Sequence, residues 1–177
     1  MTPSVTGAPP QCFAGPAWAG TVDVGEPPRR PRSGRKQGPD PQHATAVMML
    51  VDDDPQFCAL TQRLLEDTGL RAEVVPDCAG ALAALHAALT SATLPAFVVL
   101  DYNLPDGTAP SVLMAIRADP SLAHLPVLVV SQVPSATDEQ AALAAGAQAY
   151  AGKPSRVGAL RDLIVGFWHT HQATKPV

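Results

Sequence analysis

The sequence predicts an α/β protein in which helices cover both faces of a doubly wound, five-stranded parallel sheet. From residue 46 onward, short apolar runs alternate with segments of helical spacing, which is the pattern of repeated βα units. The expected strands are apolar throughout, as in parallel strands buried on both faces, and the connections are short. Because crossovers are right-handed, few topologies remain. The flavodoxin-like strand order 2-1-3-4-5 fits, since strands one and three then flank the switch point where ligands bind.

The first βα unit begins with the apolar strand 46–51. Asp54 followed by Pro55 is a helix-start signal, with Asp as the N-cap and Pro at the first helical position. Gly69 lies where a helix stop is expected, and a short second strand follows at 72–75. The apolar residues of the first helix are Phe57, Leu60, Leu64 and Leu65.

The second helix and the third strand lead to a carboxylate. Asp77 can cap the helix, and Val98 to Leu100 form a buried strand that ends at Asp101. A turn sequence precedes a third helix at about 109–118, which Pro120 ends. The expected buried positions of these two helices are Cys78, Leu82, Leu85, Leu89, Val112, Leu113 and Ile116.

The last two βα units follow the same plan. Strand 127–131 precedes Ser135, which starts a capping-box-like sequence before an Ala-rich helix that stops at Gly146. The fifth strand is expected at 148–151, and Ser155 is the expected N-cap of the last helix. The apolar face of that helix comprises Val157, Leu160, Leu163, Ile164, Phe167 and Trp168.

Residues 1–45 differ in composition from the rest of the chain. They hold nine of the nineteen prolines and five Lys/Arg against three Asp/Glu, without a hydrophobic period. Such a segment cannot bury enough apolar area to offset the entropy of ordering, so we expect a disordered, Pro-rich basic tail. Three interpretations of this tail stay open. It could bind nucleic acid or acidic surfaces through its basic run, or it could be a solvated tail without a partner. It could also be an artefact of the chosen start codon, because Met48 and Met49 follow it closely. Residues 172–177 are expected to form a short C-terminal tail.

Charge and cysteine content restrict the class of protein. A net charge of −4 argues against a general nucleic-acid binder. The three cysteines, Cys12, Cys58 and Cys78, show no CxxC spacing, so a reducing, cytoplasmic location is expected. No apolar run approaches the 18 or so residues of a membrane span, and no signal peptide is recognisable, so no membrane association is expected.

Polar groups follow four of the predicted strands. Asp52 and Asp53 lie at the end of the first strand, and Asp101 lies at the end of the third. Ser131 lies at the end of the fourth strand, and Lys153 follows the fifth. Carboxylates brought this close repel one another unless a cation or protons intervene. An all-oxygen ligand set selects a hard ion, and Mg²⁺ fits. With a hydroxyl and an ammonium nearby, the site suits phosphoryl transfer with Asp101 as the attacking nucleophile.

These residues, together with Leu104-Pro105-Asp106-Gly107, Tyr150 and Lys153-Pro154, resemble the response-regulator receiver domain of two-component signalling. The resemblance covers residues 46 to about 170 and implies a receiver domain at 46–171. It implies that a sensor histidine kinase phosphorylates Asp101 and that Mg²⁺ is held by Asp52, Asp53, Asp101 and the backbone carbonyl of Asn103. Ser131 and Lys153 would bind the phosphoryl oxygens. Tyr150 would be the switch aromatic that turns inward when Ser131 is drawn to the phosphoryl group.

The sequence departs from the family at Gln132, where a small residue usually follows the Ser/Thr. Asn103 and Val133 occupy the two positions that tune dephosphorylation in the family. A narrower resemblance, carried by residues 118–126 and by Phe167-Trp168, is to single-domain receivers paired with bacterial phytochrome kinases, which often dimerise. It implies a bacteriophytochrome partner and a homodimer through the fourth helix, fifth strand and fifth helix.

The lead hypothesis is a stand-alone response regulator without a DNA-binding output domain, which accepts a phosphoryl group and is not an enzyme that turns over external substrates. One alternative is a magnesium-dependent phosphatase of the haloacid-dehalogenase type, which also uses an Asp nucleophile. That family has a second Asp two residues after the first, where this chain has Asn103. The other alternative is a receiver-like docking module that is never phosphorylated, against which the intact set of acidic residues and Lys153 argues.

Overall fold

The structure, a computed structural model, describes residues 46–172. Its five-stranded sheet is parallel and has the order β2-β1-β3-β6-β7, so the predicted fold class and strand order are confirmed. The sheet strands are β1 (Ala46–Val51), β2 (Leu70–Val75), β3 (Phe97–Asp101), β6 (Val127–Ser131) and β7 (Ala149–Gly152). The helices are α1 (Pro55–Leu65), α2 (Cys78–Ser91), α3 (Ala109–Ala118), α4 (Ala136–Ala144) and α5 (Val157–His171).

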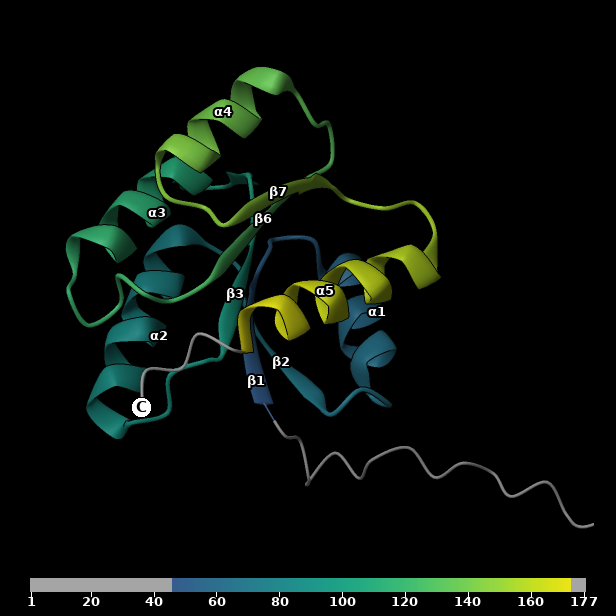
Figure 1. Ribbon diagram of the computed structural model, residues 1–177, viewed down its shortest axis with the longest axis horizontal. Coiled ribbons are helices and arrows are strands. Elements are labelled where there is room, and N and C mark those ends of the chain that lie inside the picture. Colours follow the sequence, from purple (N-terminus) through teal and green to yellow (C-terminus); the bar gives the residue numbers. More distant parts are fainter. Residues whose placement is uncertain (1–45, 173–177) are drawn as a thin grey trace, which may run out of the picture. The chain divides into compact units, whose positions relative to one another are not determined.

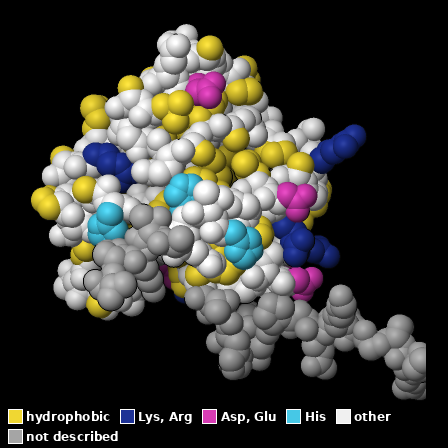
Figure 2. Space-filling model, in the orientation of Figure 1, with side chains coloured by type: hydrophobic (Ala, Val, Ile, Leu, Met, Phe, Trp, Pro, Cys, Tyr) yellow, Lys and Arg dark blue, Asp and Glu magenta, His cyan; other side chains and the backbone are white. Residues whose placement is uncertain are grey.

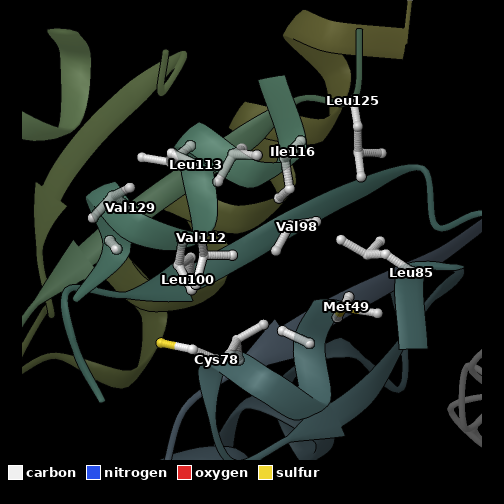
Figure 3. Close-up of a cluster of buried hydrophobic side chains, with 14 of the residues drawn as sticks. Met49, Cys78, Leu85, Val98, Leu100, Val112, Leu113, Ile116, Leu125 and Val129 are labelled. Carbon is white, nitrogen blue, oxygen red and sulfur yellow. The ribbon is translucent and has the colours of Figure 1, made fainter. Parts of the chain in front are cut away.

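The helices form a layer on each face of the sheet. In Figure 1, α1 and α5 lie on one face, and α2, α3 and α4 lie on the other. Two buried apolar clusters correspond to these faces, one including Leu65 of α1 and Ile164 of α5, the other Leu85 of α2 and Ile116 of α3. Figure 3 shows side chains of the second cluster meeting between β3, α2 and α3. The two layers cover both faces of the central strands, and this packing positions their carboxyl ends.

Local capping signals place the starts of three helices as predicted. The Asp54 carboxylate accepts from the N–H of Gln56 at 2.8 Å, at the start of α1. Asp77 caps α2 by accepting from Gly80 N–H, and Ser135 caps α4 by accepting from Asp138 N–H. Each cap satisfies a helix N–H group that would otherwise have no partner.

Three details of the prediction are wrong. Val157, expected on the apolar face of the last helix, is 50% exposed at the start of α5. Ser155 does not cap α5, which begins at Val157 after an extended Arg156 that makes no side-chain cap bond. The strand predicted at 72–75 begins at Leu70, and it is not apolar throughout: Arg71 and Glu73 are exposed and form an ion pair. As an edge strand, β2 has one side open to solvent, where charged side chains are tolerated.

The predicted turn after Asp101 contains a small antiparallel hairpin. It is made of β4 (Asn103–Leu104) and β5 (Gly107–Thr108), with Pro105 and Asp106 between them. The hairpin runs directly into α3, so it lies beside the carboxyl end of β3.

The predicted tail at 1–45 and residues 173–177 lie outside the described residues. Within residues 46–172, none of the helices has the length and apolar character that crossing a bilayer requires.

Candidate functional site

Four parallel strands end at the same edge of the sheet and bring the predicted polar residues together. Asp52 directly follows β1, Asp101 and Ser131 are the last residues of β3 and β6, and Lys153 directly follows β7. The sheet continues into the loop after β7, since Lys153 N–H donates to the carbonyl of Ser131 at 2.8 Å. Because β1 and β3 are neighbours, and α1 and α3, the helices that follow them, lie on opposite faces, this edge is the switch point of the fold.

Lys153 lies between the two buried carboxylates. Its Nζ is 2.6 Å from Oδ2 of Asp52 and 3.2 Å from Oδ1 of Asp101, and its side chain is only 8% exposed. The ammonium also lies 4.4 Å from the centroid of the Phe57 ring, at the start of α1. A cation–π contact in a desolvated place adds to the two ion pairs. Lys153 is therefore held as a fixed point charge at the strand ends.

Burial disfavours the ionised forms of the two carboxylates, Asp52 and Asp101. Burial raises the pKa of Asp52, against the opposing hydrogen bonds from Lys153 and from Asp54 N–H. Burial and then the charge of Asp52 raise the pKa of Asp101, although Lys153 lowers it. Burial alone would lower the pKa of Lys153, but the hydrogen bond and charge of Asp52 outweigh it and raise that pKa. The site thus carries more negative charge than its one lysine compensates.

The donor set fits a divalent cation. Asp52, Asp53 and Asp101 each offer a carboxylate oxygen, and these three atoms lie within 4.8 Å of one another. Asp53 is exposed whereas the other two are buried, so the group opens toward solvent. Asn103 begins β4, two residues after Asp101. Hard oxygen donors with room for water are what Mg²⁺ requires.

Ser131 and Tyr150 lie on neighbouring strands, but their hydroxyls have different surroundings. Ser131 is fully buried, and its hydroxyl has no hydrogen-bond partner within residues 46–172. The half-buried Tyr150 accepts at its hydroxyl from the N–H of Ser135 at 3.3 Å, which ties β7 to the start of α4. An unpaired buried hydroxyl is costly and is available to an incoming ligand.

Three residues make contacts in or beside the site that the sequence did not predict. Phe57, expected only as a core residue, provides the ring under Lys153. The ring of Tyr102 meets that of Tyr150 edge to face, with the centroids 6.2 Å apart. The carboxylate of Asp106 accepts from two N–H groups of α2. Their aromatic character, at positions near the acidic motif residues, was the available signal for Phe57 and Tyr102. Asp106 belongs to the Leu104-Pro105-Asp106-Gly107 motif, but nothing local to it indicates its contact with α2.

The fold and the site together define a class: a flavodoxin-like α/β protein with an acidic pocket and a lysine at its switch point. The sequence model of the response regulator receiver domain matches residues 48–165, and the chain belongs to this family. The chemotaxis protein CheY of Pseudomonas aeruginosa is 32% identical over 118 residues, which are 66% of this chain and 91% of that protein.

Solved structures similar to this one include two response regulators, one from phytochrome signalling and one with a bound metal ion. The phosphorylated cyanobacterial phytochrome response regulator RcpA is 25% identical, with a TM-score of 0.65 over 74% of this chain and 96% of that one. The Mn²⁺-bound form of the response regulator Rcp1 is 24% identical, with a TM-score of 0.63 over 75% of this chain and 98% of that one. At this level of identity, the likeness to Rcp1 shows the fold alone.

Proposed function

We propose that this receiver domain accepts a phosphoryl group from a sensor histidine kinase onto Asp101 in a Mg²⁺-dependent reaction. The observation that carries the proposal is that Asp101 lies 3.2 Å from the ammonium of Lys153 and offers an oxygen within 4.8 Å of carboxylate oxygens of Asp52 and Asp53. The chain would work as a phosphoryl acceptor in two-component signalling, as in the receiver family to which it belongs. A cytoplasmic location is part of the proposal.

In the proposed reaction, a carboxylate oxygen of Asp101 attacks phosphorus and displaces the imidazole of the phosphohistidine, which forms an aspartyl phosphate. Asp52, Asp53, Asp101 and the carbonyl of Asn103 would hold Mg²⁺, which when bound supplies positive charge to the phosphoryl oxygens. Lys153 supplies a second fixed charge, and its attraction to Asp101 lowers the pKa of that carboxyl against the burial that raises it, which favours the ionised nucleophile. The unpaired hydroxyl of Ser131 would donate to a phosphoryl oxygen.

The decisive experiment is labelling of the full chain with acetyl phosphate, with and without Mg²⁺, read as a mass increase of one phosphoryl group. Labelling should require Mg²⁺ and be lost in Asp101→Asn. Asp54→Asn is the matched control, because Asp54 adjoins the acidic pair but only caps α1, a role that Asn also fills. Its labelling should equal that of the wild type. Turnover of external phosphate esters would favour the phosphatase, and no labelling would favour the docking module.

We further propose that phosphorylation is relayed through Tyr150 to a surface made of α4, β7 and α5, through which the protein forms a homodimer. Figure 2 shows hydrophobic side chains gathered in the middle of one face, where β7 lies between α4 and α5. Leu143 of α4 is 43% exposed, and Tyr150 of β7 is half-buried. The solution mass should double with a phosphoryl mimic, and Leu143→Glu should prevent this. Leu60→Glu, a similarly exposed leucine on α1, is the control.

The proposed kinase partner is a bacteriophytochrome, supported by the likeness to RcpA at 25% identity. Phosphotransfer from a purified bacteriophytochrome kinase, compared with an unrelated histidine kinase, tests this. Faster transfer from the unrelated kinase would contradict it.

A further inference from the structure

Asp106 links the hairpin after Asp101 to the start of α2. Its Oδ1 accepts from Cys78 N–H at 2.8 Å, and its Oδ2 accepts from Ala79 N–H at 2.9 Å. The local cap of the same helix, Asp77, accepts only from Gly80 N–H, at 2.6 Å. The first turn of α2 is therefore capped by two carboxylates, one of which comes from 27–28 residues further along the chain. A carboxylate at a helix N-terminus is favoured by both the free N–H groups and the helix dipole.

The hairpin that Asp106 anchors contains Asn103. In the antiparallel pair, Asn103 is opposite Thr108 and Leu104 is opposite Gly107, so Asp106 lies in the turn between the strands. At the other end, the carbonyl of Tyr102 accepts from Ala109 N–H at 2.9 Å. These bonds fix the hairpin at its base and at its tip.

The hairpin also packs closely against the start of α2. A Cβ added to Gly107 would lie 3.2 Å from Sγ of Cys78 and 3.2 Å from Oγ of Ser111. Leu104 is buried in the cluster that contains Cys78, whose place at the start of α2 is visible in Figure 3. The two N–H groups also hold the pKa of Asp106 below its usual range, so the anchor is ionised at neutral pH. The hairpin position thus depends on one exposed side chain and on tight apolar packing.

We propose that Asp106 is a positioning residue for the metal site. It holds the β4–β5 hairpin against α2 and so keeps Asn103, two residues after Asp101, in place to offer its carbonyl to the metal. The affinity for Mg²⁺ depends on Asp106 although it does not touch the metal. The inference rests on the proposed function, since Asn103 is a ligand only if Mg²⁺ binds there. Residues that orient metal ligands without contacting the metal commonly affect affinity by about 10–100-fold.

The test is calorimetric titration of the full-length protein with Mg²⁺, in the absence of any phosphodonor. Asp106→Ala should weaken binding about tenfold. Asp77→Ala is the matched control, because it removes one carboxylate and one cap bond from the same helix end but leaves the hairpin anchored. It should bind Mg²⁺ within about twofold of the wild type. Asp106→Asn, whose carbonyl oxygen can keep one of the two bonds, should be intermediate.

Amide hydrogen exchange of the metal-free proteins gives an independent readout. In Asp106→Ala, the N–H groups of Cys78 and Ala79 should lose protection while that of Gly80 keeps it, and in Asp77→Ala the reverse should hold. Undiminished Mg²⁺ affinity in Asp106→Ala, with these amides released, would overturn the inference. So would an equal loss of affinity in Asp77→Ala, which would assign the effect to the helix. A wild-type protein that binds no Mg²⁺, or an Asp101→Asn variant that binds it as tightly, would overturn the proposed function itself.

Discussion

Lys153 lies closer to Asp52 than to Asp101, with Nζ at 2.6 Å from the first carboxylate and at 3.2 Å from the second. The shorter contact is thus made to Asp52, which is predicted only as a metal ligand, and the longer one to Asp101, which is predicted as both metal ligand and phosphoryl acceptor. Both carboxylates are buried, and Lys153 is the cation that the structure places against them. Without a metal, this lysine carries the electrostatic stability of the site.

Lys153→Met should therefore destabilise the metal-free protein by about 3 kcal/mol, because removing one partner leaves buried charge uncompensated. Urea unfolding in chelator measures the effect. The control is Arg156→Met, a nearby exposed cation without a side-chain cap bond, which should change the free energy of unfolding by less than about 0.5 kcal/mol. Mg²⁺ should stabilise Lys153→Met more than the wild type, since the ammonium no longer competes for the carboxylates. Equal stability of the Lys153→Met variant and the wild type in chelator would contradict this account.

Asp101→Asn should have the opposite effect on stability while abolishing phosphorylation. Burial and the charge of Asp52 raise the pKa of Asp101, so its ionised form costs stability once the pH exceeds the folded-state pKa. Removing the charge should raise the melting temperature of the metal-free protein by about 2–4 °C at pH 7, which corresponds to about 1 kcal/mol in a chain of this size.

The pH dependence of unfolding tests the sign of this stability change independently of its size at pH 7. Because a raised folded-state pKa means that the native state binds the proton more tightly, this contribution to stability is lost as the pH rises through that pKa. The advantage of Asp101→Asn should thus shrink as the pH is lowered toward the ordinary carboxyl value of 3.8. Saturating Mg²⁺ should reverse it at pH 7. A variant less stable than the wild type at pH 7 in chelator would contradict the prediction.

Much of this site could be predicted because each part depends on a few adjacent residues. The apolar strands ending in Asp101 and Ser131, and the caps at Asp54 and Asp77, are encoded within a few positions of sequence. Parallel pairing then brings the strand ends together without further information.

The parts that could not be predicted depend on contacts between distant residues. Asp106 reaches α2 across 27–28 residues, and Ser155 failed as a cap although its residue type is suitable. After β7, Lys153 N–H donates to the carbonyl of Ser131 and continues the parallel pairing with β6 by one residue. The backbone is still extended at Arg156, so α5 begins after it rather than after Ser155. Tertiary contacts decided against the local preference.

Gln132→Ala should speed hydrolysis of the aspartyl phosphate several-fold. Gln132 directly follows the buried Ser131 and is itself exposed, so its long amide can shield the phosphoryl group from water. Decay of the labelled protein after removal of phosphodonor measures the rate. Gln140→Ala, an exposed glutamine on α4, is the control and should decay as the wild type does. Identical time courses of phosphotransfer and decay for Gln132→Ala and the wild type would contradict the prediction.

Tyr150 should release Ser135 when a phosphoryl mimic binds. In the structure, the Tyr150 hydroxyl accepts from Ser135 N–H, while the hydroxyl of Ser131 is buried without a partner. A phosphoryl oxygen would give Ser131 that partner, and moving Ser131 would pull the loop before α4 away from Tyr150. With Mg²⁺ and beryllium fluoride, amide exchange at Ser135 should therefore accelerate.

Two variants separate the steps of this switch. In Ser131→Ala the mimic can still bind, but no hydroxyl is drawn to it, so exchange at Ser135 should stay at the unliganded rate. In Tyr150→Phe the acceptor is absent from the start, so exchange should be fast with or without the mimic. Because Tyr102 contacts Tyr150 edge to face, the near-ultraviolet circular dichroism of the two rings should change with the mimic in the wild type. Unchanged exchange and unchanged dichroism in the wild type would show that phosphorylation acts through another part of the surface.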